Sequence, residues 1–225
     1  MNATRLHRFL DLSVLLLAAV VWVPAFLICA LAVAIGSGRP IFFRQERVGL
    51  HGRRFDVLKF RSMHVGAGLR APDAHSVTRV GAFLRRTSLD ELPQLLNVLL
   101  GQMSLVGPRP MLPNQVAALD AVQHLRHQVR PGLTGLAQVR GRNSIPWAER
   151  LHHDVEWALR PTFARWGHVV LRTLVVVPTG SGATGDDASD PFVRLVFDVE
   201  PALELDRDAD VRPTIELDDR EWLRA

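Results

Sequence analysis

An uncharged apolar run near the N-terminus constrains the fold more than any other feature of the sequence. Leu12 to Ile35 is a stretch of 24 residues without a charged side chain. As one straight helix it would be about 36 Å long, which is enough to cross a bilayer. A secretory signal peptide fits less well, because the run is too long and no small-residue cleavage site follows it. The simplest interpretation is a transmembrane helix.

Two details of this run favour a re-entrant hairpin that enters the membrane and returns. Pro24 at its centre removes one backbone N–H and clashes with the carbonyl of Val20. Each half would then be about 18 Å long, too short to cross. Positive charge marks the cytoplasmic side of a membrane, and arginines flank both ends of the run: Arg5 and Arg8 before it, and Arg39, Arg44 and Arg47 after it. Because Pro-kinked spanning helices are common, these residues leave both arrangements open.

The charge of the chain is divided unevenly along its length. Residues 186–225 hold 13 acids and 5 arginines, a net charge of −8, and residues 1–185 hold 10 acids and 22 basic residues, a net charge of +12. A basic body suits an anionic partner, whether a membrane surface, a nucleotide, a lipid phosphate or a nucleic acid. Cys29 is the only cysteine, which excludes an internal disulfide and a cysteine-based metal site.

Hydrophobic periodicity and turn residues predict the remaining elements. The chain divides into three predicted parts: a membrane helix with basic flanks (1–38), a folded domain (39–180), and a linker with an acidic tail (181–225). The fold class is α/β, a compact and mostly helical domain on a membrane surface. The last helix suits a membrane interface and equally an ordinary amphipathic helix. The predicted extended segments are Pro40–Val48 and Phe55–Met63, with a turn and short strand in Pro131–Gly141; the predicted helices are Val80–Arg86, Ser88–Leu100, Asn114–His127, Pro146–Leu159 and Thr162–Val177.

Two adjacent carboxylates are candidates for chemistry or for a helix cap. Ser88 followed three residues later by Glu91 has the spacing of a capping box, and both Asp90 and Glu91 would then meet the positive end of the helix dipole. That interpretation needs no catalysis. Because neighbouring residues on a helix point in different directions, the two could instead divide two tasks. Asp90, already ionised at neutral pH, would attack phosphorus, and Glu91 would hold Mg²⁺ together with substrate phosphates.

A diphosphate substrate also requires positive charge, which arginine supplies well because its guanidinium matches phosphate oxygens. Arginines cluster in sequence around the same predicted turns. Solvated surface arginine is the alternative in so arginine-rich a chain. The cluster consists of Arg85, Arg86, Arg109, Arg140 and Arg142.

Several sequence blocks resemble one bacterial enzyme family in order and spacing. They are Lys59–Met63 (KFRSM), Thr87–Leu100 (TSLDELPQLLNVLL), Met103–Pro110 (MSLVGPRP) and Pro131–Arg142 (PGLTGLAQVRGR). The chain resembles the bacterial sugar transferases, the monotopic polyprenyl-phosphate phosphoglycosyl transferases, from about Arg5 to Pro178. The resemblance implies a re-entrant helix broken at Pro24. It also implies a catalytic domain on the bacterial cytoplasmic membrane, with its active site facing the cytoplasm.

The same resemblance implies a reaction and its residues. Asp90 would be the nucleophile that forms a covalent phosphosugar intermediate with loss of UMP, and Glu91 would help to bind Mg²⁺. The implied substrates are a UDP-sugar and polyprenyl (undecaprenyl) phosphate, in the first step of polysaccharide or glycoconjugate synthesis. The implied phosphate-binding residues are Lys59, Arg61, Arg85, Arg109, Pro110 and Arg142.

The sequence departs from the family pattern at positions without a direct chemical role. Val23 stands where a serine usually precedes the membrane proline, and Ala74-His75-Ser76 replaces a frequent Asp-Pro-Arg. Trp157 takes the place of a tyrosine that follows the recurrent acid at Asp154. The loop between Met63 and Val77 is therefore a candidate for setting the choice of sugar.

Two other functions fit parts of the sequence. A catalytically silent membrane scaffold of the same fold would use Asp90 and Glu91 only as helix caps. A membrane-tethered nucleic-acid-binding module would explain the basic body, but the chain has no recognisable nucleic-acid motif, and we expect no nucleic-acid partner. A homo-oligomer is compatible with the sequence.

Overall fold

The computed structural model of the chain describes residues 3–64, 76–141 and 144–179. Within them the fold combines helices with two small sheets, as the predicted α/β class requires. The predicted acidic tail and its linker lie outside the described residues.

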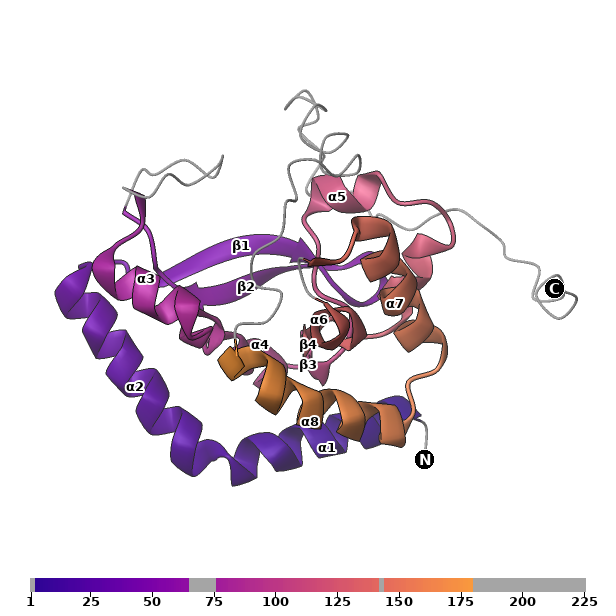
Figure 1. Cartoon of the computed structure of the whole chain (residues 1–225), viewed down its shortest axis with the longest axis horizontal. Helices are drawn as coiled ribbons and strands as arrows, with labels where there is room; N and C mark the ends of the chain where they lie inside the picture. The colour runs from indigo at the N-terminus through magenta and orange to yellow at the C-terminus, as the bar shows by residue number, and fades with distance from the viewer. Residues whose placement is uncertain (1–2, 65–75, 142–143, 180–225) are drawn as a thin grey trace, which may run out of the picture.

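The N-terminal apolar run forms a pair of helices that meet at a bend (Figure 1). Helix α1 spans Ala3–Leu17 and α2 spans Ala19–Gly36. Only α2 is long and apolar enough to cross a membrane by length and composition, with a mean hydropathy of 2.5, and 11% of it is buried in the protein. The described part of the chain therefore has one N-terminal apolar helix of this kind.

The helix break falls at Ala18 and not at the predicted Pro24. Pro24 lies inside α2, where its missing N–H affects one rung of the ladder. At Ala18 the chain can bend because a side chain replaces a backbone bond: the indole Nε1 of Trp22 donates to the carbonyl of Leu15 at 2.9 Å. Because the indole N–H pairs with the freed carbonyl, the bend does not leave an unpaired backbone group in an apolar helix.

The first sheet is a β-hairpin, as the extended patterns predict. Strand β1 (Phe42–Val48) pairs antiparallel with β2 (Arg54–Phe60) around a short 3₁₀ turn (Leu50–Gly52). Gly52 has φ +75° in this turn, a region that glycine enters without steric cost. The hairpin lies across the molecule from α1 and the C-terminal helix, which run side by side (Figure 1).

Short helices and a second sheet connect the hairpin to the C-terminal helices. Strands β3 and β4 are parallel and pair Ser104 with Gly132 and Val106 with Thr134. The elements, in chain order, are α3 (Arg79–Arg86), η3 (Leu89–Glu91), α4 (Gln94–Leu99), β3 (Ser104–Val106), α5 (Pro113–Ala117), η4 (Gln123–Gln128), β4 (Gly132–Thr134), α6 (Leu136–Arg140), α7 (Trp147–Leu159) and α8 (Phe163–Thr179).

The helices predicted at α3, α7 and α8 are confirmed to within two residues. The predicted Asn114–His127 helix is divided into α5 and η4. The short strand predicted within Pro131–Gly141 is confirmed as β4, whereas β3 and α6 were not predicted. A three-residue strand is too short to show a period of two, so sequence periodicity could not identify β3.

Helix α8 separates a core face from an exposed apolar face. Trp166 and Val169 are buried against Trp157 and Val106 in one hydrophobic cluster. On the other side of α8, Phe163 and Leu174 are exposed. A second buried contact ties α8 to the N-terminal helix, because Asp11 of α1 accepts hydrogen bonds from Trp166 Nε1 (3.2 Å) and Ser104 Oγ (2.5 Å). The N-terminal helix is thus attached to the rest of the protein by a buried carboxylate.

Candidate active site

A sharp turn between α3 and α4 presents the two carboxylates. Ser88 adopts φ +58° and ψ +14°, a left-handed conformation that is uncommon for a residue other than glycine. It begins the 3₁₀ turn that carries Asp90 and Glu91. The predicted capping box is wrong, because the Ser88 side chain makes no capping hydrogen bond and α4 begins after Pro93. Since the left-handed backbone starts a separate turn here, capping does not explain the pair of acids.

Glu91 is held by two cations from different parts of the chain. Its Oε1 accepts hydrogen bonds from Lys59 Nζ at 2.7 Å and from Arg109 Nη2 at 2.8 Å. The side chains of Glu91 and Lys59 are 19% and 23% exposed, and that of Arg109 is 53% exposed. Burial by itself would raise the pKa of Glu91, but the charges of Arg109 and Lys59 outweigh it and hold the pKa far below its usual range. Glu91 is therefore ionised at neutral pH.

Asp90 lies in the field of the same groups. Burial raises the pKa of Asp90, and the nearby positive charge of Lys59 opposes the rise, while Glu91 adds to it. Arg85 and Arg109 also lower the pKa. Burial prevails, so the pKa of Asp90 lies above its usual range, and a bound cation would favour the ionised form.

The buried amide of Asn97 fixes the strand that carries Lys59. Asn97 Oδ1 accepts from the Leu58 N–H at 3.1 Å, and its Nδ2 donates to the Asp56 carbonyl at 2.8 Å. The same Nδ2 donates to Gln102 Oε1 at 2.7 Å. Asn97 thus joins β2 to α4, the helix that follows Glu91, and sets the position of Lys59 relative to Glu91.

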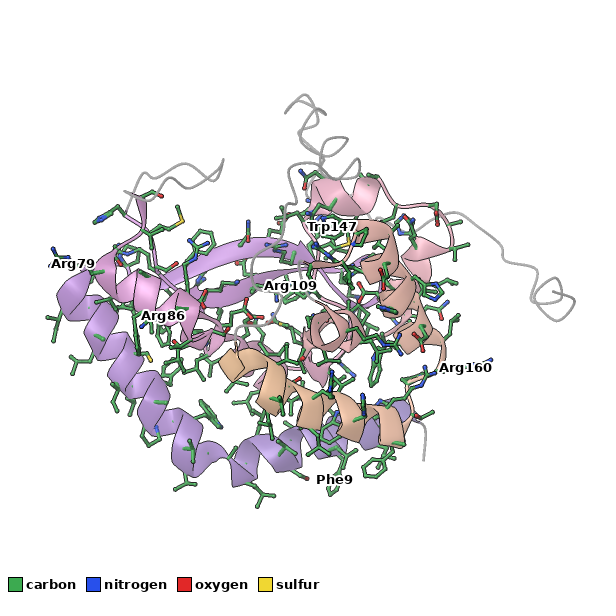
Figure 2. All side chains as sticks on the ribbon, viewed as in Figure 1. Phe9, Arg79, Arg86, Arg109, Trp147 and Arg160 are labelled. Atoms are coloured by element: carbon green, nitrogen blue, oxygen red, sulfur yellow. The ribbon has the colours of Figure 1, made fainter. Side chains whose placement is uncertain are left out.

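The Pro108-Arg109-Pro110 segment carries Arg109, the second cation that contacts Glu91. Figure 2 places Arg109 in the middle of the protein, between the hairpin and the helices α6 and α8, whereas Phe9 points outward from α1. One of the five N–H donors of Arg109 serves Glu91, so others remain for a ligand. Pro110 is buried, and its carbonyl accepts from Arg47 Nη1 at 3.1 Å.

Arg47 is a site residue that the sequence argument missed. The sequence pattern assigns Arg47 only to the basic flank of the apolar run. Burial and the charge of Arg109 lower the pKa of Arg47 to about 10, although the charge of Glu91 opposes them. The guanidinium of Arg47 therefore lies in the same electrostatic neighbourhood. The available signal was the position of Arg47 near the end of a strand whose partner carries Lys59.

Other predicted residues lie apart from this cluster. Arg61 is buried and donates to the carbonyl of Ser37, the residue that ends α2. Its predicted contact with phosphate is untested, and the contact that it makes holds the end of α2. Arg140 forms an ion pair with Glu156 at 2.9 Å. Arg142 lies outside the described residues.

The donor set suits a metal ion that needs only one or two protein ligands. No group of three or more His, Cys, Asp or Glu side chains comes together in the described parts of the chain. Mg²⁺ needs no such cage, because it commonly takes one or two carboxylates and completes its shell with phosphate oxygens and water. Asp90 and Glu91 can supply these carboxylates, and Glu91 Oε2 accepts no hydrogen bond from the described residues.

Taken together, the fold and site define a class of protein. Two adjacent carboxylates beside Lys59 and Arg109, each with spare donors, form a site for a phosphate-bearing substrate on an apolar, helix-rich domain. Residues 2–180 match the family model described as bacterial sugar transferase. The chain belongs to this family of enzymes, and the predicted resemblance is confirmed.

Relatives with informative names cover most of the chain. It is 42% identical over 191 residues to a UDP-glucose:undecaprenyl-phosphate glucose-1-phosphate transferase of Caulobacter vibrioides, covering 78% of this chain and 71% of that protein. It is 44% identical over 155 residues to the uncharacterized sugar transferase EpsL of Bacillus subtilis, covering 67% and 76%. It is 33% identical over 200 residues to the exopolysaccharide production protein ExoY of Sinorhizobium fredii, covering 78% and 87%.

Proposed function

We propose that this protein transfers a sugar-1-phosphate from a UDP-sugar to polyprenyl phosphate, with Asp90 as the nucleophile. The observation that carries the proposal is the arrangement at Glu91, where Lys59 and Arg109 converge on one carboxylate oxygen beside Asp90. Such a set of fixed charges can bind a diphosphate and stabilise the charge that develops on it. The Caulobacter relative is named for UDP-glucose and undecaprenyl phosphate, which supports both substrate classes.

In the first step, a carboxylate oxygen of Asp90 attacks the sugar-bearing phosphorus of the UDP-sugar. The new bond joins this oxygen to phosphorus, and the bond from phosphorus to the bridging oxygen breaks. UMP leaves with the bridging oxygen and its electron pair. The cations Arg109 and Lys59 offset the negative charge that the leaving phosphate gains.

In the second step, an oxygen of polyprenyl phosphate attacks the same phosphorus. The bond between Asp90 and phosphorus breaks, the carboxylate is restored, and polyprenyl-diphosphate sugar is the product. A covalent intermediate divides one difficult exchange into two easier ones. It also lets the water-borne and lipid-borne substrates bind in turn.

Glu91 and Asp90 are the residues that would hold Mg²⁺ in this scheme. When bound, the ion would neutralise charge on the diphosphate. Glu91 stays ionised, and its Oε2 accepts no hydrogen bond from the described residues, so it could serve this purpose without losing Lys59 or Arg109.

The exposed apolar side chains of α1, α2 and α8 support attachment to a membrane. Leu16, Val20 and Ile35 are 77%, 79% and 78% exposed, and a soluble protein rarely exposes so many neighbouring apolar groups. We assign this face to the bacterial cytoplasmic membrane. The basic flanks support a cytoplasmic location for both ends of the apolar run and for the active site. The re-entrant arrangement and interfacial α8 belong to this proposal.

The test is a UMP-release assay with purified protein in detergent, undecaprenyl phosphate and Mg²⁺. A panel of UDP-sugars is supplied, with UDP-glucose first. We expect release with at least one donor, dependence on both lipid phosphate and Mg²⁺, loss after chelation by EDTA, and no release from Asp90→Ala. Release that continues in Asp90→Ala would refute the nucleophile. No release from folded wild-type protein with any donor would favour the catalytically silent scaffold.

A further inference from the structure

The segment that carries Arg109 is poor in backbone N–H donors. Pro108 and Pro110 flank Arg109, and proline has no N–H to donate. The segment belongs to no helix or strand. Arg109 has the one backbone N–H of these three residues, so the carbonyl oxygens are most of the backbone groups left to bind.

The four consecutive carbonyls of residues 108–111 each accept a hydrogen bond from a donor on β4, η4 or β1. The N–H of Gly132 donates to Pro108 O at 2.8 Å, and the N–H of Val48 donates to Met111 O at 3.0 Å. These outer two bonds are ordinary backbone contacts to β4 and β1. The inner two carbonyls, those of Arg109 and Pro110, are each bound by a guanidinium.

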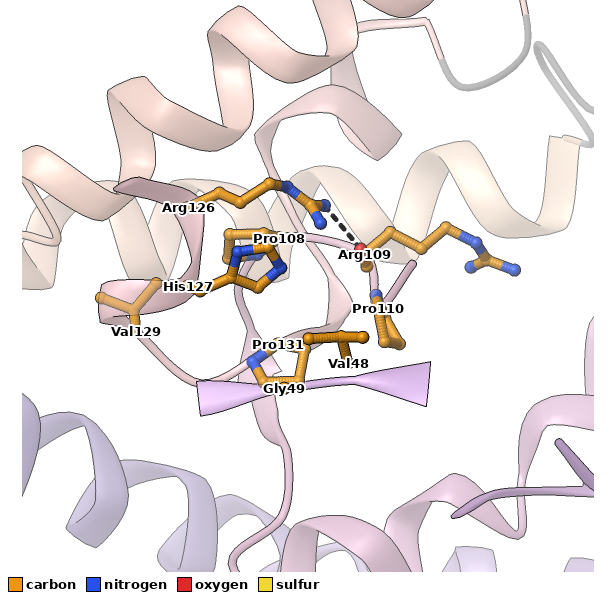
Figure 3. A pocket seen from close by; sticks show the side chains of 9 residues that line it. All are labelled: Val48, Gly49, Pro108, Arg109, Pro110, Arg126, His127, Val129 and Pro131. Carbon is orange, nitrogen blue, oxygen red and sulfur yellow. Dashed lines mark hydrogen bonds between the residues drawn. The ribbon is translucent and has the colours of Figure 1, made fainter. Parts of the chain in front are cut away.

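Arg126 binds the first of these inner carbonyls. Its Nη2 donates to Arg109 O at 2.6 Å (Figure 3). The same guanidinium is fixed by Asp154 of α7, whose Oδ2 lies 2.6 Å from Nη2 and 3.2 Å from Nε. Both side chains are almost fully buried, at 2% and 6% exposure. Figure 3 shows the Arg109 side chain extending away from Arg126, so Arg126 acts on its backbone and not on its charge.

Arg47 binds the second inner carbonyl. Its Nη1 donates to Pro110 O at 3.1 Å, and its Nη2 donates to Gln45 Oε1 at 2.6 Å, which holds the guanidinium in place. Arg47 lies on β1, while Lys59 lies on the paired strand β2. The hairpin thus sets Lys59 directly and Arg109 through Arg47.

We infer that Arg47 and the Arg126–Asp154 pair are positioning residues that clamp the backbone of Arg109 and thereby place its guanidinium on Glu91 and the substrate phosphate. The inference rests on the proposed function and adds to it residues that have no predicted contact with substrate. The two prolines remove two of the three backbone N–H groups of this segment, so the guanidinium contacts to its carbonyls carry much of its positioning. A shift of about 1 Å in such a group can cost about 100-fold in rate.

The first experiment measures UMP release by Arg47→Met, with Arg44→Met as the matched control. Arg44 lies on the same strand and is exposed, so its loss removes the same charge without touching the clamp. We expect about a 10- to 100-fold loss of kcat/KM in Arg47→Met, partial recovery in Arg47→Lys, and less than about a 2-fold change in Arg44→Met. Equal activity of Arg47→Met and Arg44→Met would overturn the inference.

A double-mutant cycle distinguishes positioning from direct substrate contact. If Arg47 acts through Arg109, then adding Arg47→Met to Arg109→Gln causes little further loss, less than about 2-fold. A further loss of about 10-fold or more would mean that Arg47 acts independently, and would overturn the inference. The other half of the clamp is tested with the pair Arg126→Met and Asp154→Leu, which removes both buried charges together and leaves neither unpaired.

Hydrogen exchange separates failure of this inference from failure of the proposed function. It follows the peptide that covers residues 105–112 in folded protein and needs no substrate. We expect faster exchange in Arg47→Met and no change in Arg44→Met. If wild-type protein releases no UMP with any donor, the reaction is refuted, and the exchange result still decides whether the clamp exists. Unchanged exchange in Arg47→Met would overturn the clamp whatever the activity.

Discussion

Lys59 Nζ lies 2.7 Å from Glu91 Oε1 and joins the second strand of the hairpin to the turn that carries both carboxylates. The two residues are 32 positions apart in sequence. Their contact leaves further donors on Lys59. It therefore connects the β-hairpin to the turn that we assign to chemistry.

Replacement of Lys59 tests this contact. We expect Lys59→Met to lower kcat for UMP release by about 100-fold, because one of the two cations that face the diphosphate is lost. Lys59→Arg should retain more activity than Lys59→Met. The control is Arg79→Met, at an exposed position at the start of α3, which should leave the rate unchanged. A Lys59→Met enzyme with the wild-type rate would remove Lys59 from the site.

Asn97 should be one of the most costly polar residues to replace. Asn97→Leu leaves the N–H of Leu58 and the carbonyl of Asp56 without their partner inside the protein. We expect the free energy of unfolding to fall by about 2–4 kcal/mol, measured by urea denaturation in detergent. Asn114→Leu, at an exposed position, should change it by about 0.5 kcal/mol or less. Equal effects of the two changes would show that the Asn97 hydrogen bonds add little.

His127 should make stability depend on pH. Burial, together with the charge of Arg126 and the neighbouring His124, lowers the pKa of His127 to about 3. Because the folded state binds the proton less tightly than the unfolded state, the His127 contribution is complete above about pH 6.5 and is lost as the pH falls toward 3. Between pH 7 and pH 5 the loss is at most about 2 kcal/mol.

The measurement compares urea unfolding of wild type and His127→Phe at these two pH values. The variant should lose this part of the pH dependence, whereas His168→Phe, at an exposed position on α8, should keep it. If the free energy of unfolding changes equally with pH in wild type and His127→Phe, the pKa of His127 is not lowered by folding.

The topology of the apolar run can be tested with single cysteines. Asn2→Cys and Arg44→Cys are made in a Cys29→Ala background, so that each protein has one thiol. If the run is re-entrant, a membrane-impermeant maleimide labels both positions in inside-out vesicles and neither in right-side-out vesicles. Labelling of Asn2→Cys only in right-side-out vesicles would establish a spanning helix.

The sequence was a good guide to elements with long periodic patterns and to residues with strong chemical character. The hairpin and helices α3, α7 and α8 follow from hydrophobic spacing. Asp90, Glu91, Lys59 and Arg109 come together as their charges and the family resemblance imply.

Other features depend on contacts that no local pattern reveals. The bend at Ala18 requires the Trp22 indole on the carbonyl of Leu15, so the proline at position 24 was a misleading signal. The capping-box prediction was wrong because Ser88 adopts a left-handed conformation that the local sequence does not predict. Arg126 and Asp154 are far apart in sequence, and only the folded chain shows that they hold Arg109.

The most direct test of the central claim is intact-protein mass spectrometry after incubation with Mg²⁺ and the UDP-sugar that supports UMP release, without polyprenyl phosphate. The account predicts a covalent adduct with the mass of one sugar phosphate, located on Asp90 by peptide mapping. The adduct should be absent from Asp90→Asn and should disappear when polyprenyl phosphate is added. An adduct on another residue, or turnover of both substrates with no adduct at any time, would contradict it.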